Sequence, residues 1–243
     1  MKEGNVYIGT SGWNYDHWKG TFYPDSEKKR DWFPLYQSSF STVEINNTFY
    51  NLPSEETVDK WHADSNPDFL YSLKASRYIT HMKKLKDPEQ STPSFLSVVR
   101  RLGEKSGPVL FQLPPKWNRN TERLKAFLED LPDGYEYTFE FRDPSWFHAD
   151  IYKPLSEFNA AFCIYHWEGN ESPRELTADF VYIRLHGPDG AYRGKYSKRE
   201  LSGWAGAITA WKNQGRDIYC YFNNDENGFA PQNALELLEM LGG

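Results

Sequence analysis

The sequence predicts an α/β protein, a single (β/α)8 TIM-like barrel with an eight-stranded parallel sheet ringed by helices. Two observations lead to this fold class. Short apolar runs rich in β-branched and aromatic side chains recur eight times along the 243 residues, and helical patterns separate them. Such alternation is typical of a parallel sheet with crossover helices, and eight units in a chain of this length fit a closed barrel. We therefore expect one domain over residues 1–243. An open doubly wound sheet is the alternative, but no G-x-G-x-x-G motif follows the first strand.

The expected strands are runs of four to seven residues, as is usual for a buried parallel sheet. They cover residues 6–10, 42–46, 69–74, 109–113, 137–142, 161–165, 180–186 and 218–223.

Helices are expected between the strands, on the evidence of caps and apolar spacing. Thr92 followed by Pro93 predicts an N-cap with a proline at the first helical position. Ser197 and Glu200 have the spacing of a capping box. Apolar residues at helical spacing predict further helices over 124–131 and from Pro231 onward, and weaker patterns fit 31–38, 55–65 and 150–158. The segment 167–177 is expected to be irregular.

Composition excludes several classes of protein. The chain has 28 basic and 34 acidic residues, a net charge of −6, which argues against a wholly basic nucleic-acid binder. No apolar run reaches the roughly 18 residues that a membrane span needs. The first residues lack the apolar region of a signal peptide, so we expect a cytoplasmic protein. Cys163 and Cys220 lie in apolar runs and have neither disulfide nor metal spacing.

The carboxyl ends of the expected strands carry many polar side chains. In a barrel these ends form the functional face, and the alternation of side chains along a strand places the polar residues on one face and the apolar residues on the other. The polar face is then predicted to point into the upper mouth of the barrel. The residues concerned are Glu44, Asn46, Lys74, Gln112, Glu140, Arg142, Arg184, His186 and Asn223.

Loop residues extend this predicted pocket. Trp13, Tyr50 and Tyr192 supply aromatic walls, and Arg77 adds a cation. The cations favour an anionic ligand with phosphate or carboxylate groups, because the planar fork of arginine matches both. Glu44 or Glu140 could act as a general base and His186 as an acid or base near neutral pH. The alternative interpretation is structural, with these groups forming ion pairs that only satisfy one another.

No metal and no cofactor are expected. Glu44, Glu140 and His186 could ligate an ion, but a zinc site or a metal pair usually recruits more His and Asp, and the cations beside them disfavour a divalent ion. The remaining histidines are expected at the surface or in loops and are given no role: His17, His62, His148 and His166.

Six short motifs run through the whole chain in order. They are GTSGW at 9–13, EINNTFY at 44–50, FQLPP at 111–115, EFRDPSWF at 140–147, RLHG at 184–187 and YFNND at 221–225. With these motifs the sequence resembles the DUF72 (YecE-like) family of uncharacterised TIM-barrel proteins. The resemblance implies a TIM-like (β/α)8 barrel. A likeness of that barrel to metal-dependent DNA-repair endonucleases, suggested for relatives, implies a role with nucleic acid, although the His/Asp/Glu cluster that such enzymes need is not visible here.

Three functional hypotheses follow. The first is an enzyme that acts on a small or polymeric anionic substrate, with hydrolysis of a phosphate or glycosidic bond as the reaction considered. The alternative is a single-stranded nucleic-acid-binding or DNA-repair-associated protein without its own chemistry, which would combine cations with aromatic platforms. The third is a small-ligand sensor or a domain that only binds a partner. No membrane partner is expected, and no protein partner is predicted.

Overall fold

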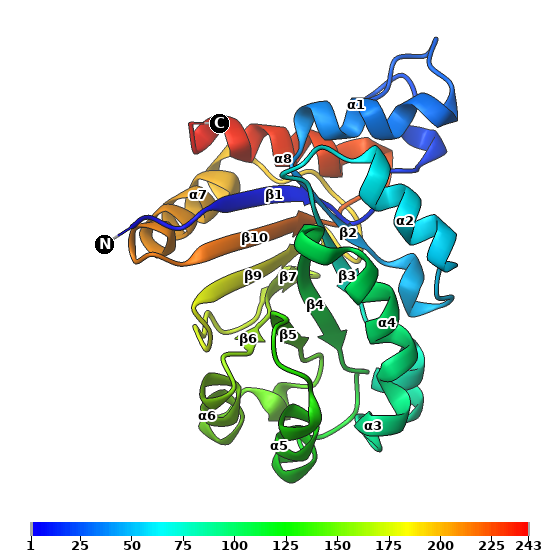
Figure 1. Ribbon diagram of the computed structural model, residues 1–243. Coiled ribbons are helices and arrows are strands. Elements are labelled where there is room, and N and C mark those ends of the chain that lie inside the picture. The colour runs from blue at the N-terminus through cyan, green and yellow to red at the C-terminus, as the bar shows by residue number, and fades with distance from the viewer. Residues whose placement is uncertain (1, 243) are drawn as a thin grey trace. The chain divides into compact units, whose positions relative to one another are not determined.

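A computed structural model describes residues 2–242, and it shows a mixed α/β fold in which strands and helices alternate along most of the chain (Figure 1). The residue contacts divide the chain into two compact units. The first unit comprises residues 2–44, 164–172 and 180–242, and the second comprises residues 45–163 and 173–179. The strands form two five-stranded sheets.

The first unit contains the sheet with the order β1-β10-β9-β7-β8. Neighbouring strands pair in parallel, except that β8 runs antiparallel to β7. Helices α7 and α8 contact each other and β10, and α8 also contacts β1 (Figure 1). The bounds are β1 Val6–Thr10, α1 Trp32–Ser39, β7 Ile164–Trp167, β8 Asn170–Glu171, β9 Phe180–Leu185, α7 Lys198–Asn213, β10 Asp217–Phe222 and α8 Phe229–Met240.

The other sheet has the order β2-β3-β4-β5-β6, and the pairs from β3 to β6 are parallel. In the second unit α2 contacts α4, and α5 contacts α6. The bounds are β2 Thr42–Ile45, α2 Glu55–Asp64, β3 Leu70–Lys74, α3 Pro88–Ser91, α4 Pro93–Arg101, β4 Ser106–Gln112, α5 Thr121–Asp130, β5 Tyr137–Glu140, α6 Ala149–Glu157 and β6 Ala161–Phe162. Short 3-10 or π turns occupy Asp16–Trp18, Lys29–Asp31, Asn47–Phe49, Tyr78–Met82, Gly103–Lys105, Pro144–Trp146 and Glu226–Gly228.

All eight expected strand positions hold a strand, but the sheet differs from the prediction. In place of one eight-stranded parallel sheet, the described residues form two sheets of five strands, and one strand is antiparallel. The sixth expected strand is divided at Cys163 into β6 and β7. In the segment expected to be irregular, Glu168 and Gly169 both have positive φ angles, 51° and 72°, which is the turn conformation that joins the antiparallel hairpin of β7 and β8.

The expected helices are present, and their ends show why. The capping box of α7 is confirmed: Ser197 accepts from the Glu200 backbone at 3.3 Å, and the Ser197 backbone donates to the Glu200 carboxylate at 2.8 Å. Thr92 does precede Pro93 at the start of α4, but its hydroxyl donates to the Pro88 carbonyl at 2.8 Å instead of capping α4. The helix expected from Pro231 begins two residues earlier, at Phe229.

No helix within residues 2–242 combines the length and the apolar character that a crossing of a lipid bilayer requires.

Candidate functional site

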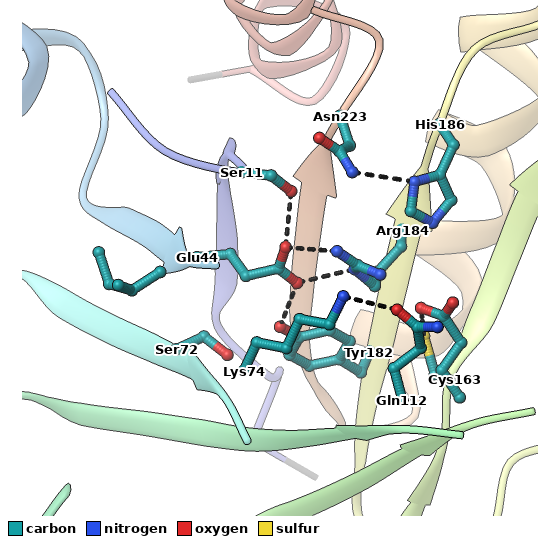
Figure 2. A network of polar contacts seen from close by, with 12 residues as sticks. Ser11, Glu44, Ser72, Lys74, Gln112, Cys163, Tyr182, Arg184, His186 and Asn223 are labelled. Carbon is teal, nitrogen blue, oxygen red and sulfur yellow. Dashed lines mark hydrogen bonds and ion pairs between the residues drawn. The ribbon is translucent and has the colours of Figure 1, made fainter. Parts of the chain in front are cut away.

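A buried carboxylate, Glu44, forms the centre of a polar network in the first unit (Figure 2). Glu44 lies in β2, and Ser11, the residue after β1, forms an isolated bridge with it. One carboxylate oxygen accepts from the Tyr182 hydroxyl at 2.8 Å and from the Arg184 Nε at 2.8 Å. The other accepts from the Ser11 hydroxyl at 2.6 Å and from the Arg184 Nη2 at 2.7 Å. Tyr182 and Arg184 are two residues apart in β9, so the alternation of the strand places both on the face that meets Glu44.

The environment of Glu44 stabilises its ionised form. Burial by itself would raise the pKa of this carboxyl, but the charge of Arg184 and the hydrogen bonds from Arg184, Ser11 and Tyr182 together lower the pKa below its usual range. Both oxygens already accept two hydrogen bonds, so the carboxylate is well suited to orient Arg184 and poorly suited to take up a proton. Its assignment as a general base stays a prediction.

A second, smaller group of contacts in the first unit surrounds His186, the residue that follows β9 (Figure 2). The Asn223 amide nitrogen lies 3.1 Å from the His186 Nδ1. Because an amide nitrogen only donates, Nδ1 accepts and the neutral ring carries its proton on Nε2. The rings of Trp167 and Tyr192 stand edge-on to the imidazole, with centroid distances of 4.9 and 5.9 Å. The ring contacts hold the plane of the imidazole.

A cavity of about 700 Å³ opens beside these residues in the first unit. This volume is in the range typical of sites for small molecules. Asn223 and Tyr192, both predicted to bind substrate, line it. The full lining is Tyr15, His17, Thr21, Ala191, Tyr192, Arg193, Asn223, Asp225, Glu226 and Asn227.

Asp225 is a carboxyl of the cavity lining whose pKa is raised. Its carboxylate accepts a hydrogen bond from the Trp18 Nε1 at 2.5 Å, and the His17 Nε2 lies 2.9 Å from its other oxygen. Burial raises the pKa of Asp225, and the opposing effects of Trp18 and His17 do not cancel that rise. A carboxyl with a raised pKa at the wall of a cavity is a candidate proton donor.

Tyr15 connects the cavity to the Glu44 network. Tyr15 lines the cavity, and its hydroxyl donates to the Ser11 carbonyl at 2.6 Å. The hydroxyl of the same serine donates to Glu44. Burial first, and then the charges of Asp225 and Glu44, raise the pKa of Tyr15, so this hydroxyl stays protonated as a donor.

The second unit holds a separate group of the predicted residues. The Lys74 ammonium donates to the Gln112 side-chain oxygen at 2.5 Å and lies 4.4 Å from the ring centroid of Phe49. Glu140 forms an ion pair with Arg142, and the Cys163 thiol lies 3.8 Å from the other Glu140 oxygen. Two of the three arginines predicted to bind an anion, Arg142 here and Arg184 in the first unit, therefore already contact a carboxylate of their own unit.

The remaining predicted residues lie in loops. Trp13 is half-buried against Phe33, and its carbonyl accepts from the Tyr23 hydroxyl at 2.6 Å. Asn46 starts the turn Asn47–Phe49, with its carbonyl accepting from the Phe49 backbone at 3.0 Å. Tyr50, at 66% exposure, and Arg77 are at the surface of the second unit.

Eight of the ten lining residues of the cavity were not predicted to bind substrate, and Tyr15, His17 and Asp225 are among them. Tyr15 was seen only as one of many loop aromatics, and His17 was expected to be a surface or loop histidine without a role. Asp225 ends the run at 221–225 and follows β10 by three residues, so its place after a strand end was the signal that could have found it. Within residues 2–242 no group of three or more His, Cys, Asp or Glu side chains has the geometry of a metal site.

Comparison with known families gives one match over nearly the whole chain. The model of the family described as "Protein of unknown function DUF72" matches residues 7–243. The UPF0759 protein YunF of Bacillus subtilis (strain 168) is 26% identical, with the alignment covering 97% of this chain and 94% of that protein. The UPF0759 protein YecE of Escherichia coli (strain K12) is 29% identical over 58% of this chain and 50% of its own length.

Solved structures agree with this result. A DUF72 family protein from Thermotoga maritima MSB8 superposes with a TM-score of 0.89 at 29% identity, covering 98% of this chain and all of that one. A DUF72 family protein from Enterococcus faecalis V583 superposes with a TM-score of 0.80 at 20% identity, covering 98% of this chain and 96% of that one, and this second likeness shows the fold alone.

Proposed function

The chain belongs to the DUF72 family of proteins of unknown function, and we propose a function from the geometry of its own residues. We propose that it is a hydrolase that acts on a substrate bearing a phosphate or carboxylate group. The proposed site is the cavity of the first unit. The observation that carries the proposal is Asp225, a carboxyl with a raised pKa that lines this cavity and is held in place by Trp18 and His17.

The chemistry we propose is hydrolysis with Asp225 as the proton donor. The bond between the phosphorus or anomeric carbon and the leaving oxygen breaks, and the Asp225 proton goes to that oxygen. Water supplies a hydroxyl group to the phosphorus or carbon, and its remaining proton restores Asp225. A raised pKa suits the first step, because the carboxyl must still carry its proton near the working pH.

Other cavity residues would position the substrate. Arg193 is an exposed cation of the lining and can hold the anionic group of the substrate by a forked contact. Tyr15 and Tyr192 offer aromatic faces with polar tips. Asn223, a lining residue, would connect the cavity to the buried His186 imidazole.

The three residues predicted from the sequence to be catalytic have different roles in this proposal. His186 remains a candidate acid or base. Glu44 would act as a positioning residue, since it orients Arg184 and, through Ser11, the loop that carries Tyr15. Glu140 lies in the second unit, outside the proposed cavity, and its catalytic role stays a prediction.

We also propose that the chain is one closed (β/α)8 barrel domain of a cytoplasmic protein. Support comes from the eight strand positions, which all hold strands, and from the parallel pairing of β1, β10, β9 and β7 and of β3 to β6. A crystal structure with one continuous ring of strands is the expected result, and an open sheet would overturn this part of the proposal.

The test compares turnover by the unchanged protein, Asp225→Asn and Asp133→Asn on chromogenic phosphate esters, carboxylic esters and glycosides. Asp133 is an exposed carboxylate of the second unit and serves as the matched control. We expect Asp225→Asn to lower kcat about 10²-fold or more, as loss of a general acid does. The rate of the unchanged protein should fall as the pH rises through the raised pKa of Asp225. Full activity of Asp225→Asn, or no turnover of any of the three substrate classes, would overturn the proposal.

A further inference from the structure

A second cavity, in the second unit, has a strongly basic lining. Its volume is about 530 Å³. The lining contains four cations and a single carboxylate, in a protein whose overall charge is −6. The lining residues are Met82, Lys83, Lys84, Lys86, Asp87, Trp117, Asn120 and Arg123. A local excess of positive charge on an acidic protein indicates an anionic ligand.

The lysine-bearing loop is held in one conformation. Leu85, in the middle of the loop, is buried at 1% exposure, and its backbone donates to the Ile79 carbonyl at 3.0 Å. The Arg123 Nη1 donates to the Lys84 carbonyl at 3.2 Å. Lys84 and Leu85 have φ angles of 49° and 62°, a left-handed conformation that such residues rarely adopt. These contacts hold the backbone of the loop in place. The lysines are therefore already close together before a ligand binds.

The one carboxylate of the lining, Asp87, forms an ion pair with a lysine of the same loop. Asp87 lies 2.9 Å from the Lys83 ammonium, four residues earlier in the chain. This ion pair leaves the charges of Lys84, Lys86 and Arg123 in excess at the cavity. Three cations on one small concave surface match a ligand with more than one phosphate group better than a single carboxylate.

Trp117 provides a flat wall beside these cations. The Lys84 ammonium lies 5.8 Å from the centroid of its ring. Trp117 also contacts the ring of Trp146 edge-on, with the ring centroids 5.2 Å apart, and the Trp146 Nε1 donates to the Trp117 carbonyl at 2.5 Å. Trp117 is only half-buried and is held by Trp146, so it is a rigid surface on which a planar ring can stack.

We propose that this cavity binds phosphate groups that are joined to a planar base, the chemistry shared by a free nucleotide and by single-stranded nucleic acid. Lys84, Lys86 and Arg123 contact the phosphates, and Trp117 stacks with a base. Cations along a phosphate backbone together with an aromatic platform are the combination that single-strand binding uses. The site is separate from the cavity of the proposed enzyme, so either proposal can fail without the other.

The experiment measures binding of a fluorescein-labelled ten-nucleotide thymidine strand by fluorescence anisotropy at several salt concentrations. The double variant Lys84→Gln/Lys86→Gln is compared with Lys125→Gln/Lys153→Gln. The control removes the same two charges from exposed lysines of α5 and α6 outside the cavity. We expect the cavity double variant to bind at least about tenfold more weakly and to reduce the slope of log K against log salt by about 1.4, or 0.7 for each lost phosphate contact. The control should stay within about twofold of the unchanged protein.

Two further arms identify the ligand. Unlabelled thymidine monophosphate and inorganic phosphate compete against the labelled strand, and Trp117→Leu tests stacking, with a thermal melt to confirm that this variant is folded. Displacement by the mononucleotide at concentrations where phosphate has no effect supports a nucleotide-type site, and weaker binding by folded Trp117→Leu supports the stacking. Equal losses in both double variants would show only diffuse charge attraction and would overturn the proposal, as would the absence of strand binding at low salt.

Discussion

Two buried carboxylates, Glu44 in the first unit and Glu140 in the second, each pair with an arginine, and the two pairs are built differently. Glu44 and Arg184 are 140 residues apart in the chain and meet through two hydrogen bonds between different strands. Glu140 and Arg142 are two residues apart, with Glu140 as the last residue of β5 and Arg142 beyond its end. The Glu44 carboxylate also accepts from Ser11 and Tyr182, and the Cys163 thiol, a weak donor, lies 3.8 Å from Glu140.

This difference separates a tertiary contact from a local one. The pairing of Glu44 with Arg184 forms only when β2 and β9 reach their final positions, so its energy supports the folded state alone. The Glu140–Arg142 pair lies within one extended segment and can form in part before the chain folds. The exposed fractions point the same way, since the side chain of Arg184 is 1% exposed and that of Arg142 is 10% exposed. We therefore expect the first pair to contribute more to stability than the second.

The largest effect should come from Glu44→Gln. The substitution removes the ionised Glu44 acceptor from the buried Arg184 guanidinium, and loss of one partner of a buried ion pair costs about 3–5 kcal/mol. Urea unfolding at pH 7 measures the change. Glu239→Gln, an exposed position of α8, is the control and should change the free energy of unfolding by less than about 0.5 kcal/mol. A loss at Glu44 no greater than at Glu239 would contradict a stabilising role for the pair.

The acid dependence of stability should be altered by the same substitution. The pKa of Glu44 is lower in the folded protein than the roughly 4.3 of an unfolded chain. The ionised group therefore contributes its full stability above that pH and loses it as the pH falls through the folded pKa. Glutamine does not titrate, so the gap between the unchanged protein and Glu44→Gln should shrink between pH 7 and pH 3. A gap that stays constant in urea unfolding over this range would show that Glu44 is not the group responsible.

Glu140→Gln should cost less, about 1.5–3 kcal/mol, which is typical for the loss of hydrogen bonds to a charged group. Arg142 is closer to solvent than Arg184, so water can replace part of the lost contact. Urea unfolding of Glu140→Gln and Glu44→Gln under the same conditions makes the comparison direct. If Glu140→Gln were the more destabilising variant, the distinction between the local and the tertiary pair would be wrong.

The two pairs also show how far the sequence alone could lead. Alternation along a strand correctly predicts that Tyr182 and Arg184 share a face, because side-chain direction depends only on the backbone. The same alternation makes Glu140 and Arg142 neighbours. The partner of Arg184 was beyond prediction, since it depends on which strands lie side by side and in which register.

Loops limited the prediction of the candidate site more than strands did. Asn223 and His186 follow strand ends and were found, whereas His17 lies in a long loop and resembles any other loop histidine in the sequence. Its contact with Asp225 spans more than two hundred residues and is visible only once the chain is folded. Strand ends can thus be placed from periodicity, but the loop residues that complete a cavity cannot.

The last comparison concerns two tyrosines on one sheet face of the first unit, and the smallest expected cost is that of Tyr221→Phe. Tyr182 donates to the ionised Glu44, whereas the Tyr221 hydroxyl lies 2.8 Å from the neutral Thr42 hydroxyl. Both hydroxyls are buried, and the substitution to Phe removes the same atom from each. Because a charged acceptor strengthens a hydrogen bond, Tyr182→Phe should cost about 1.5–3 kcal/mol and Tyr221→Phe about 0.5–1.5 kcal/mol. The control is urea unfolding of both variants in the Glu44→Gln background. There the amount by which Tyr182→Phe costs more than Tyr221→Phe should largely disappear. If that difference persists, it comes from packing and not from the charge of Glu44.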